Sequence, residues 1–361
     1  MAERLESRSL AFLKRLLATP GPSGFEQAPA RAWRAEVEAF ADEVTVDVAG
    51  NSVAAVNTAG RPRVMLTGHI DEIGFMITHI DDEGYLYFSP IGGWDSQVAV
   101  GQRVEILADG GSTVGVIGKR AIHLMKPEDR DKVSKFDDLW IDIGASSKKQ
   151  ALTMVSVGDA AVLSGAVHEL PNRRIVSRSI DNRIGAFVAA EALRLVARSR
   201  KTVKAAVYAV ATVQEEIAYS GGGARTGSTR LEPDVAVVVD VTHATDYPGA
   251  EKKQHGDHRL GGGPVLTRGS SVNPRVFELL RDTARRLEIP HTVQAAPLHT
   301  STDADAIATS ARGVPTGLVS VPNRYMHSPN EMVALDDLAR AARLLAAFAV
   351  ALDAKADFRP A

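Results

Sequence analysis

The sequence predicts an α/β protein: a three-layer sandwich around a central mixed sheet, with a small all-β domain inserted into it. Three observations lead to this fold class. Helical and strand-like segments alternate at both ends of the chain, the middle of the chain lacks helical periodicity, and the alternation resumes afterwards instead of starting anew. We therefore expect two domains, one formed by residues 1–71 together with 164–361 and the other by residues 72–163.

The N-terminal part predicts two helices followed by strands. Apolar residues recur at helical spacing from Leu5 to Leu17, before the breaker that begins at Thr19. Ser23 and Glu26 form a capping-box pattern that opens a second helix. A hairpin and a short apolar strand are expected next, at residues 44–56 and 64–67.

The middle of the chain consists of short β-rich runs separated by Gly, Asp and Pro turns. The expected strands lie at residues 73–80, 85–88, 103–107, 113–117 and 139–143. Because helical periodicity is nearly absent here, this segment predicts the inserted all-β domain.

The second half of the chain alternates between helices and strands. Helices are expected at residues 181–196, from 220, at 274–287, from 303 and at 335–352, and strands at 203–213, 235–240, 264–267, near 293 and at 316–321. This pattern is typical of a sheet that helices cover on both faces.

Composition narrows the class of protein. The 361 residues are 45% hydrophobic and 24% charged, as in folded water-soluble proteins. The 42 Lys and Arg nearly balance the 44 Asp and Glu, so neither nucleic acid nor a membrane is an expected partner. No apolar run reaches bilayer length and the first residues do not resemble a secretory signal, so we expect a cytoplasmic protein. With no cysteine, any metal must be held by His, Asp and Glu.

The first candidate site follows the apolar strand at residues 64–67. His69 and Asp71 are two residues apart, which in extended backbone aims both side chains the same way. Asp71 is thus placed to orient the histidine-bearing segment behind a metal. By itself this pattern is weak, since a hydrogen-bonded turn histidine beside a surface aspartate fits it equally well.

Two adjacent glutamates end the long apolar strand of the second half. Glu215 and Glu216 point in different directions, so one carboxylate can bind a metal while the other remains free as a base. Asp181 stands at the start of a predicted helix, where capping is the ordinary role of an aspartate. Capping and bridging two metals do not exclude each other.

Two further ligands are expected near strand ends. Asp240 follows an apolar β-branched run, and His327 lies in a loop after the strand at residues 316–321. His243 and Asp246 compete with Asp240 as ligands, but neither lies at the expected strand end.

These groups together match the inventory of a hydrolytic site with two metals. Two histidines and three carboxylates give each metal one histidine and one terminal carboxylate, with one aspartate between the metals and one glutamate left free. A set of nitrogen and oxygen ligands allows zinc, cobalt or manganese. The polar stretch around Thr302 and Asp303 can line a substrate pocket or cap a helix.

The motifs also resemble a known family. The segments GHIDEIG, SIDNRIG, VQEE, VVVDVTH, TSTDADAI and HSPNE occur in this order, with LWIDIGASSKKQA ending the inserted segment. Chains with this order are the cytoplasmic dinuclear metallopeptidases called tetrahedral, glutamyl or deblocking aminopeptidases, with a zinc-peptidase-like sandwich. Some of them have been described as endoglucanases. The resemblance extends from about Leu10 to Asp353, and Ser301 departs from it where a glycine is expected.

The resemblance implies a role for each candidate residue. It makes His69 and Asp240 ligands of one metal, Glu216 and His327 ligands of the other, and Asp181 the bridge between them. Glu215 becomes the general base and Asp71 a supporting carboxylate. It further implies that the inserted domain forms dimers and that dimers assemble into a dodecamer enclosing the sites.

The resulting hypothesis is an aminopeptidase that hydrolyses N-terminal residues from peptides with a free N-terminus, by a water that two divalent metals activate and Glu215 deprotonates. The ligand set alone also fits a deacylase, a carboxypeptidase or another two-metal amidohydrolase. A metal-free endoglucanase with two carboxylates, or a shell protein with structural metals, is the alternative from another class.

Overall fold

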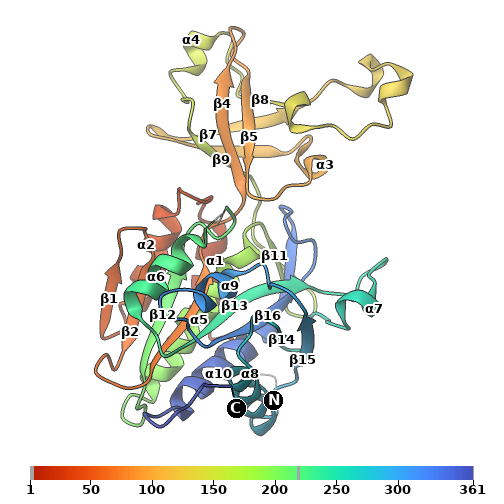
Figure 1. The fold of residues 1–361 in the computed structure, drawn as a ribbon. Helices are drawn as coiled ribbons and strands as arrows, with labels where there is room; N and C mark the ends of the chain where they lie inside the picture. The colour runs from red at the N-terminus through yellow and green to blue at the C-terminus, as the bar shows by residue number, and fades with distance from the viewer. Residues whose placement is uncertain (1–3, 218–219, 361) are drawn as a thin grey trace.

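The computed structural model describes residues 4–217 and 220–360. A large α/β body carries a small β-barrel that stands above it (Figure 1). Two connections join the parts, one before the first barrel strand and one after the last.

The central sheet of the body has eight strands in the described part of the chain. In spatial order they are β1 (Glu43–Val46), β2 (Ser52–Val56), β12 (Ala206–Thr212), β3 (Arg63–His69), β13 (Val235–His243), β16 (Thr316–Asn323), β14 (Val265–Gly269) and β15 (Thr292–Ala296). The four central strands, β12, β3, β13 and β16, pair in parallel with one another. Antiparallel pairing joins β1 to β2, β2 to β12 and β14 to β16. The sheet is therefore mixed, as predicted.

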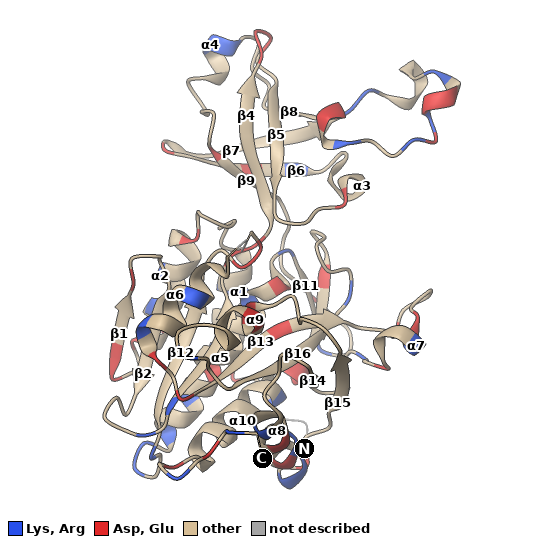
Figure 2. Cartoon of the chain, viewed as in Figure 1, with Lys and Arg blue, Asp and Glu red and all other residues tan. Residues whose placement is uncertain are grey.

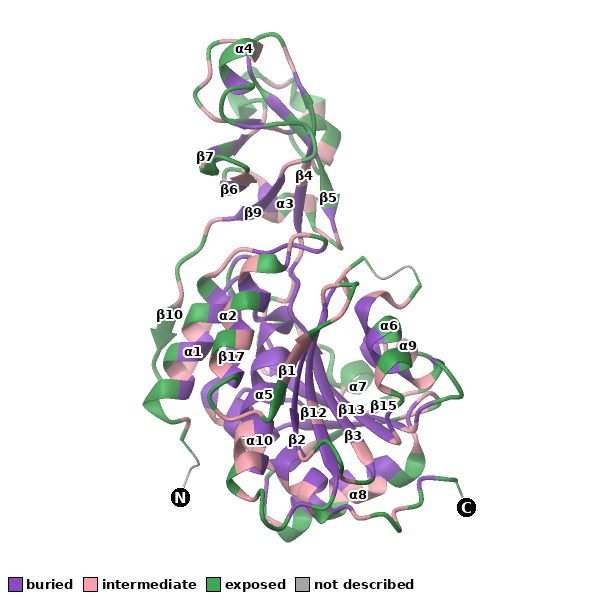
Figure 3. Cartoon of the chain, turned by 90° about the vertical axis from the view of Figure 1, so that its left-hand side faces the viewer, coloured by how far each residue is buried: buried purple, intermediate pink, exposed green. Residues whose placement is uncertain are grey.

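Helices cover both faces of this sheet (Figure 3). One face carries α1 (Ser7–Ala18), α2 (Gln27–Val37), α5 (Ile180–Arg198), α8 (Pro274–Arg286) and α10 (Leu335–Ala351), and the other carries α6 (Gly222–Leu231) and α9 (Asp303–Ala308). Because neither face of the central strands meets water, these strands read as nearly continuous apolar runs. The predicted three-layer sandwich is confirmed.

Six strands form the closed barrel. They are β4 (Gly74–Ile80), β5 (Leu86–Ile91), β8 (Trp140–Asp142), β7 (Gly111–Gly118), β6 (Arg103–Ala108) and β9 (Ala160–Leu163). The barrel has its own apolar core, which includes Phe75, Ile106 and Ile141 and is separate from the core of the sandwich. The all-β insertion is thus present, while the domain boundaries at residues 71/72 and 163/164 stay predictions.

Strand β9 was not among the expected strands, because four consecutive buried apolar residues show no alternation. Short helices also interrupt the β-rich segment. They are α3 (Ser96–Ala99), α4 (Lys148–Ala151) and the 3₁₀ turns η1 (Ile122–Leu124), η2 (Pro127–Asp129) and η3 (Phe136–Asp138). The three turns lie on an arm between β7 and β8 that carries charges of both signs (Figure 2).

A small three-stranded sheet lies beside the end of the central sheet where the candidate site is built. It consists of β10 (His168–Leu170), β11 (Arg174–Ser177) and β17 (Glu331–Ala334), and the short helix α7 (Lys252–His255) lies in a neighbouring loop. The sequence analysis predicted none of these four elements. Pairing of Ser177 with Glu331 brings the loop that contains His327 next to the start of α5.

Two local predictions were wrong. Ser23 and Glu26 do not cap α2: the Ser23 hydroxyl donates to Asp71, and Glu26 accepts backbone N–H groups of Gly24 and Gln214. Strand β13 continues past Asp240, since parallel pairing with β16 extends to His243. Partners distant in the sequence decided both outcomes.

Candidate metal centre

The candidate residues converge at the carboxyl ends of the parallel strands. His69 ends β3, Glu215 and Glu216 follow β12 and Asp240 lies in β13. Carboxyl ends of parallel strands meet at one edge of a sheet, which is where α/β proteins bind ligands. Asp181 at the start of α5 and His327 after β16 join this group.

Two glycines allow α5 to approach the sheet closely enough for this. A Cβ on Gly68 would lie 2.3 Å from the carbonyl carbon of Gly185, and a Cβ on Gly185 would lie 2.6 Å from the carbonyl oxygen of Val239. Asn182 then donates from Nδ2 to that same Val239 oxygen at 2.8 Å. This contact holds the start of α5, and with it Asp181, beside β3 and β13.

Asp181 lies between the two histidines. Its Oδ1 is 3.3 Å from Nε2 of His69, and its Oδ2 is 3.5 Å from Nε2 of His327. His327 Nε2 is also 3.4 Å from Oε2 of Glu216, while His69 Nε2 is 3.6 Å from Oε2 of Glu215. One carboxylate thus presents one oxygen to each half of the cluster.

The cluster is crowded with buried charge. Burial raises the pKa of Glu215 to about 10, against the effect of His69 and with the help of Asp240. The pKa values of Glu216 and Asp240 are raised as well, in both cases first by burial and then by the charge of Asp181.

Asp181 and its histidines behave in the opposite way. Burial opposes ionisation of Asp181, but hydrogen bonds with His327 and His69 outweigh it and hold the pKa of Asp181 below its ordinary value. Burial also disfavours the charged form of His327, yet Asp181 and Glu216 raise its pKa to about 11. The carboxylates thus stabilise positive charge at this place.

These properties fit divalent cations. Ligand atoms of His69, Asp181 and Glu216 lie within 4.8 Å of one another, and so do those of His69, Glu215 and Asp240. Oε1 of Glu216 is buried and lacks a hydrogen-bond partner in the described part of the chain. Imidazole nitrogen and carboxylate oxygen are ligands that zinc, cobalt and manganese accept.

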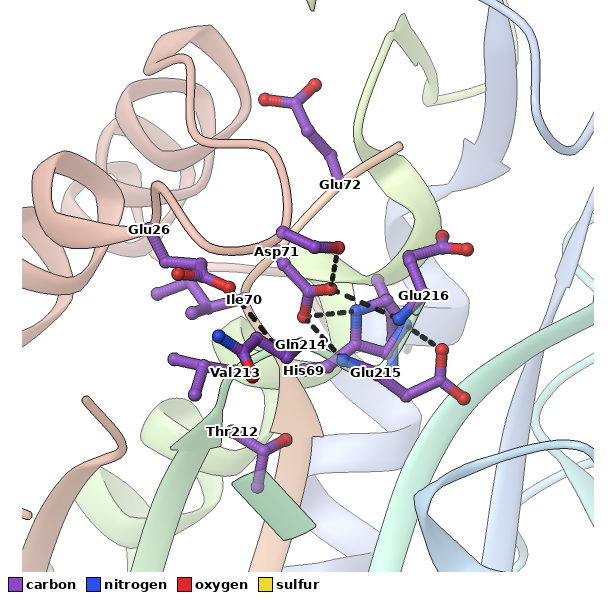
Figure 4. A network of polar contacts seen from close by, with 12 residues as sticks. Glu26, His69, Ile70, Asp71, Glu72, Thr212, Val213, Gln214, Glu215 and Glu216 are labelled. Atoms are coloured by element: carbon purple, nitrogen blue, oxygen red, sulfur yellow. Dashed lines mark hydrogen bonds and ion pairs between the residues drawn. The ribbon is translucent and has the colours of Figure 1, made fainter. Parts of the chain in front are cut away.

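Asp71 lies beside His69 and the turn that carries Glu215 and Glu216 (Figure 4). Its Oδ1 is 3.3 Å from Nδ1 of His69 and accepts the backbone N–H of Glu215 at 3.2 Å, while Oδ2 accepts the N–H of Glu216 at 3.1 Å. Ser23 donates its hydroxyl to Oδ2 at 2.6 Å. Asp71 is thus placed to orient His69, as the spacing predicts, and it also accepts the backbone N–H groups of both adjacent glutamates, which the sequence analysis did not anticipate.

Glu331 was missed by the sequence analysis, although it belongs to the quoted HSPNE motif. It is buried, its Oε2 accepts the backbone N–H of Asp181 at 3.0 Å, and its Oε1 accepts that of His327 at 3.0 Å. One carboxylate thereby fixes the backbone of two candidate ligands. A glutamate four residues after a histidine in a polar loop was the available signal.

A cavity of about 610 Å³ adjoins the cluster. Glu215, Glu216 and His327 line it, together with residues of α6 and α9 that include Arg225 and Asp303. The capping expectation for the stretch before α9 is confirmed, because Thr302 accepts the N–H of Ala304. Thr302 also lines the cavity, while its role in a substrate pocket stays a prediction.

Ser301, the position where the family pattern has a glycine, has a φ of 55°. Glycine adopts this left-handed conformation without steric cost. Here Asp305 accepts the backbone N–H groups of Thr300 and Ser301 and so holds the loop in place.

The two competing ligands of the sequence analysis have other contacts. Asp246 pairs with Arg324 at 2.8 Å. The ring centroids of His243 and His255 lie 6.2 Å apart in an edge-on arrangement.

No helix among the described residues is long and apolar enough to cross a bilayer.

Comparisons with known proteins agree with the motif analysis. The family model described as M42 glutamyl aminopeptidase matches residues 50–344. The lysyl aminopeptidase of Pyrococcus furiosus is 33% identical over 336 residues, which are 91% of this chain and 92% of that protein.

Solved structures give the same result. The TET aminopeptidase of Thaumarchaeota archaeon SCGC AB-539-E09 superposes with a TM-score of 0.90 at 34% identity, covering 96% of this chain and 97% of that one. The Pyrococcus horikoshii TET1 peptidase, which can assemble into a tetrahedron or a large octahedral shell, gives a TM-score of 0.84 at 31% identity, covering 95% and 100%. The resemblance stated from the motifs is confirmed.

Proposed function

Because the chain belongs to the M42 glutamyl aminopeptidase family, we propose that it is a metal-dependent aminopeptidase that releases N-terminal residues from peptides. One observation carries the proposal: Asp181 presents an oxygen to each of two histidines while a partly exposed carboxylate, Glu215, lines the adjoining cavity. This arrangement suits hydrolysis with two metals and a separate base.

The ligand roles in this proposal follow the family resemblance. His69 and Asp240 would hold one divalent ion, Glu216 and His327 the other, and Asp181 both. The chemistry that zinc, cobalt or manganese supplies when bound is acidification of a water molecule and polarisation of a carbonyl. The separate oxygens of Asp181 support the bridging role.

Glu215 acts as the general base. Its side chain is 16% exposed, compared with 6% for Glu216, and it reaches the cavity where the substrate carbonyl would lie. A carboxylate at this place can accept a proton from an attacking water as a general base. Glu215 takes the proton of the attacking water at its carboxylate and returns it to the nitrogen of the leaving amine.

The walls of the cavity favour substrates with a free N-terminus. Several carboxylates line it, among them Glu216 and Asp303, so the positive charge of an α-ammonium group is attracted to this place. An acylated N-terminus lacks that charge. The volume of about 610 Å³ is in the range of small-ligand sites.

We also propose that the chain forms homo-oligomers through the barrel and that its sites face an enclosed chamber. Large apolar side chains are exposed on the barrel, including Val114, Leu152 and Val157. Dodecameric and shell-like assemblies of similar proteins support this proposal. The cytoplasmic location stays a prediction.

A substrate panel tests the activity. We expect the metal-loaded protein to hydrolyse aminoacyl-nitroanilides but not their N-acetylated counterparts, and a chelator to abolish the hydrolysis. Release of nitroaniline from the acetylated compounds at equal rates would indicate an amidohydrolase that needs no free N-terminus, and release of acetate from them would indicate a deacylase. Chelator-resistant cleavage of a cello-oligosaccharide would indicate an endoglucanase instead.

A further inference from the structure

The turn that carries Glu215 and Glu216 is hydrogen-bonded to side chains from the N-terminal part of the chain. Strand β12 ends at Thr212, so the amides that follow need acceptors outside the sheet. Each of the next four donates to a side chain: Val213 to Asn51 Oδ1 at 3.1 Å, Gln214 to Glu26 Oε1 at 3.1 Å, Glu215 to Asp71 Oδ1 at 3.2 Å and Glu216 to Asp71 Oδ2 at 3.1 Å.

Gln214 is the residue at which the chain turns. Its φ is 59°, in the left-handed region. A residue with a Cβ adopts such a conformation at a steric cost and keeps it only when its surroundings impose it. The acceptor of the Gln214 amide is therefore part of what sets the direction of the Glu215 and Glu216 side chains.

That acceptor, Glu26, is buried and held in a fixed position. Figure 4 shows its carboxylate next to Gln214. Glu26 is 6% exposed, and its Oε1 also accepts the N–H of Gly24 at 2.7 Å, which fixes the carboxylate. It makes no capping bond to α2, although it flanks that helix. In the same loop as Glu26, Ser23 donates its hydroxyl to Asp71, the carboxylate that accepts the next two amides of the turn. One short segment therefore supplies Glu26 and also contacts Asp71.

We propose that Glu26 is a positioning residue of the active site: by accepting the Gln214 amide it holds the turn that aims Glu215 and Glu216 at the histidines. Glu26 does not line the cavity and acts only through this turn. The inference rests on the proposed function for its kinetic consequence, but its structural consequence can be measured without any activity.

Two substitutions separate positioning from simple burial. Glu26→Leu removes the acceptor at similar volume, and Glu26→Gln keeps an amide oxygen that can accept the same N–H group. A matched control is Glu191→Leu, because Glu191 is buried as well, at 7% exposed, but bonds Ser9 and Arg194 far from the turn.

The first readout is hydrogen exchange of the segment that contains Gln214, Glu215 and Glu216, followed by mass spectrometry. We expect Glu26→Leu to speed exchange there at least about tenfold, since the amide of Gln214 loses its acceptor. Glu26→Gln and Glu191→Leu should leave exchange of this segment close to that of the wild type.

The second readout is turnover of an aminoacyl-nitroanilide with metal in excess. A misplaced catalytic group lowers kcat and changes KM little. We therefore expect about ten- to a hundredfold loss of kcat in Glu26→Leu with nearly unchanged KM. Glu26→Gln should recover most of this loss, and Glu191→Leu should keep the wild-type kcat.

Unchanged exchange and kcat in folded Glu26→Leu would overturn the inference. If Glu26→Leu does not fold, Glu26→Asp decides by the same readouts, because it keeps the charge but withdraws the acceptor by one methylene. A wild-type protein that hydrolyses no aminoacyl substrate would refute the proposed function, whereas the exchange result would still test the role of Glu26.

Discussion

Glu215 and Glu216 are adjacent in the sequence but lie in different surroundings. Both line the cavity, but Glu216 is nearly buried next to His327, whereas Glu215 is more exposed and comes within 3.6 Å of His69. The ligand atoms of Glu215 group with those of His69 and Asp240. Whether Glu215 is a base or a ligand is therefore the decisive question at the residue scale.

Glu215→Gln answers it. If Glu215 is the base, the variant keeps the metal content of the wild type and loses about a hundred- to ten-thousandfold in kcat, because an amide does not accept the proton. Metal analysis and steady-state kinetics on one sample measure both. More than a tenth of the wild-type rate, or loss of metal, would contradict the assignment.

Asp181→Ala should behave differently. Removing the carboxylate that lies between His69 and His327 takes one oxygen from each half of the cluster. We expect loss of bound metal together with loss of turnover. Full metal occupancy in the folded variant would exclude Asp181 as the bridge.

The sequence identifies the candidate ligands better than the residues that hold those ligands in place. His69, Asp71 and the glutamate pair stand out because polar residues at the ends of apolar strands are unusual. Glu26 stands out only as a capping candidate, and Glu331 only by its spacing from His327. Their bonds to the backbone amides of Gln214 and Asp181 join distant segments, and no periodicity or local spacing records those two bonds.

At the scale of elements, a buried ion-pair network joins the first helices to the start of α5. Glu72 Oε1 accepts from Arg183 Nη2 at 2.8 Å and from the Gly21 N–H at 3.0 Å, and Arg178 also donates to Glu72. Arg183 is fully buried and donates from Nη1 to the carbonyl oxygen of Leu16 at 2.7 Å. The network connects α1, the residue after Asp71 and α5.

Glu72→Ala should therefore be costly to stability. It leaves two buried guanidinium groups without their carboxylate, and breaking a buried pair in this way costs about 3–5 kcal/mol of unfolding free energy. Urea unfolding measures the loss. As a control, Glu6→Gln removes ion pairs of a half-exposed carboxylate and should cost less than about 1 kcal/mol. Equal, small effects of both would contradict the role of the network.

The helices and strands of the body follow from apolar periodicity, which is why most were predicted within a few residues. The exceptions are short elements defined by pairing. Strands β10, β11 and β17 have three or four residues each. Strand β10 pairs with β11 across a short turn, and β11 pairs with β17, which lies more than 150 residues away in the sequence. Such segments are too short to show a period.

At the scale of the whole molecule, the barrel contributes none of the candidate ligands. Its exposed apolar side chains include Leu124 at 75%, Val114 at 63% and Val157 at 59%. A surface of this kind is typical of a contact between subunits. We expect light scattering to give an oligomer built on dimers, and a mass near 38.5 kDa at micromolar concentration would refute this.

Excision of the barrel tests the same point from the other side. Replacing residues 72–163 by a short Gly/Ser bridge removes the proposed contact and also Glu72. We expect the remaining sandwich, where it folds, to be monomeric by light scattering. A folded oligomer of the size of the intact protein would place the contact on the sandwich instead.

We propose that two metals at the cluster around Asp181 make this chain a hydrolase. Titration of metal-stripped protein with zinc or cobalt tests this when metal content and turnover of an aminoacyl-nitroanilide are followed together. We expect no turnover in the stripped protein and a rise in turnover that ends at two equivalents of bound metal per chain. Full turnover without metal would contradict it, and so would two bound equivalents without any turnover.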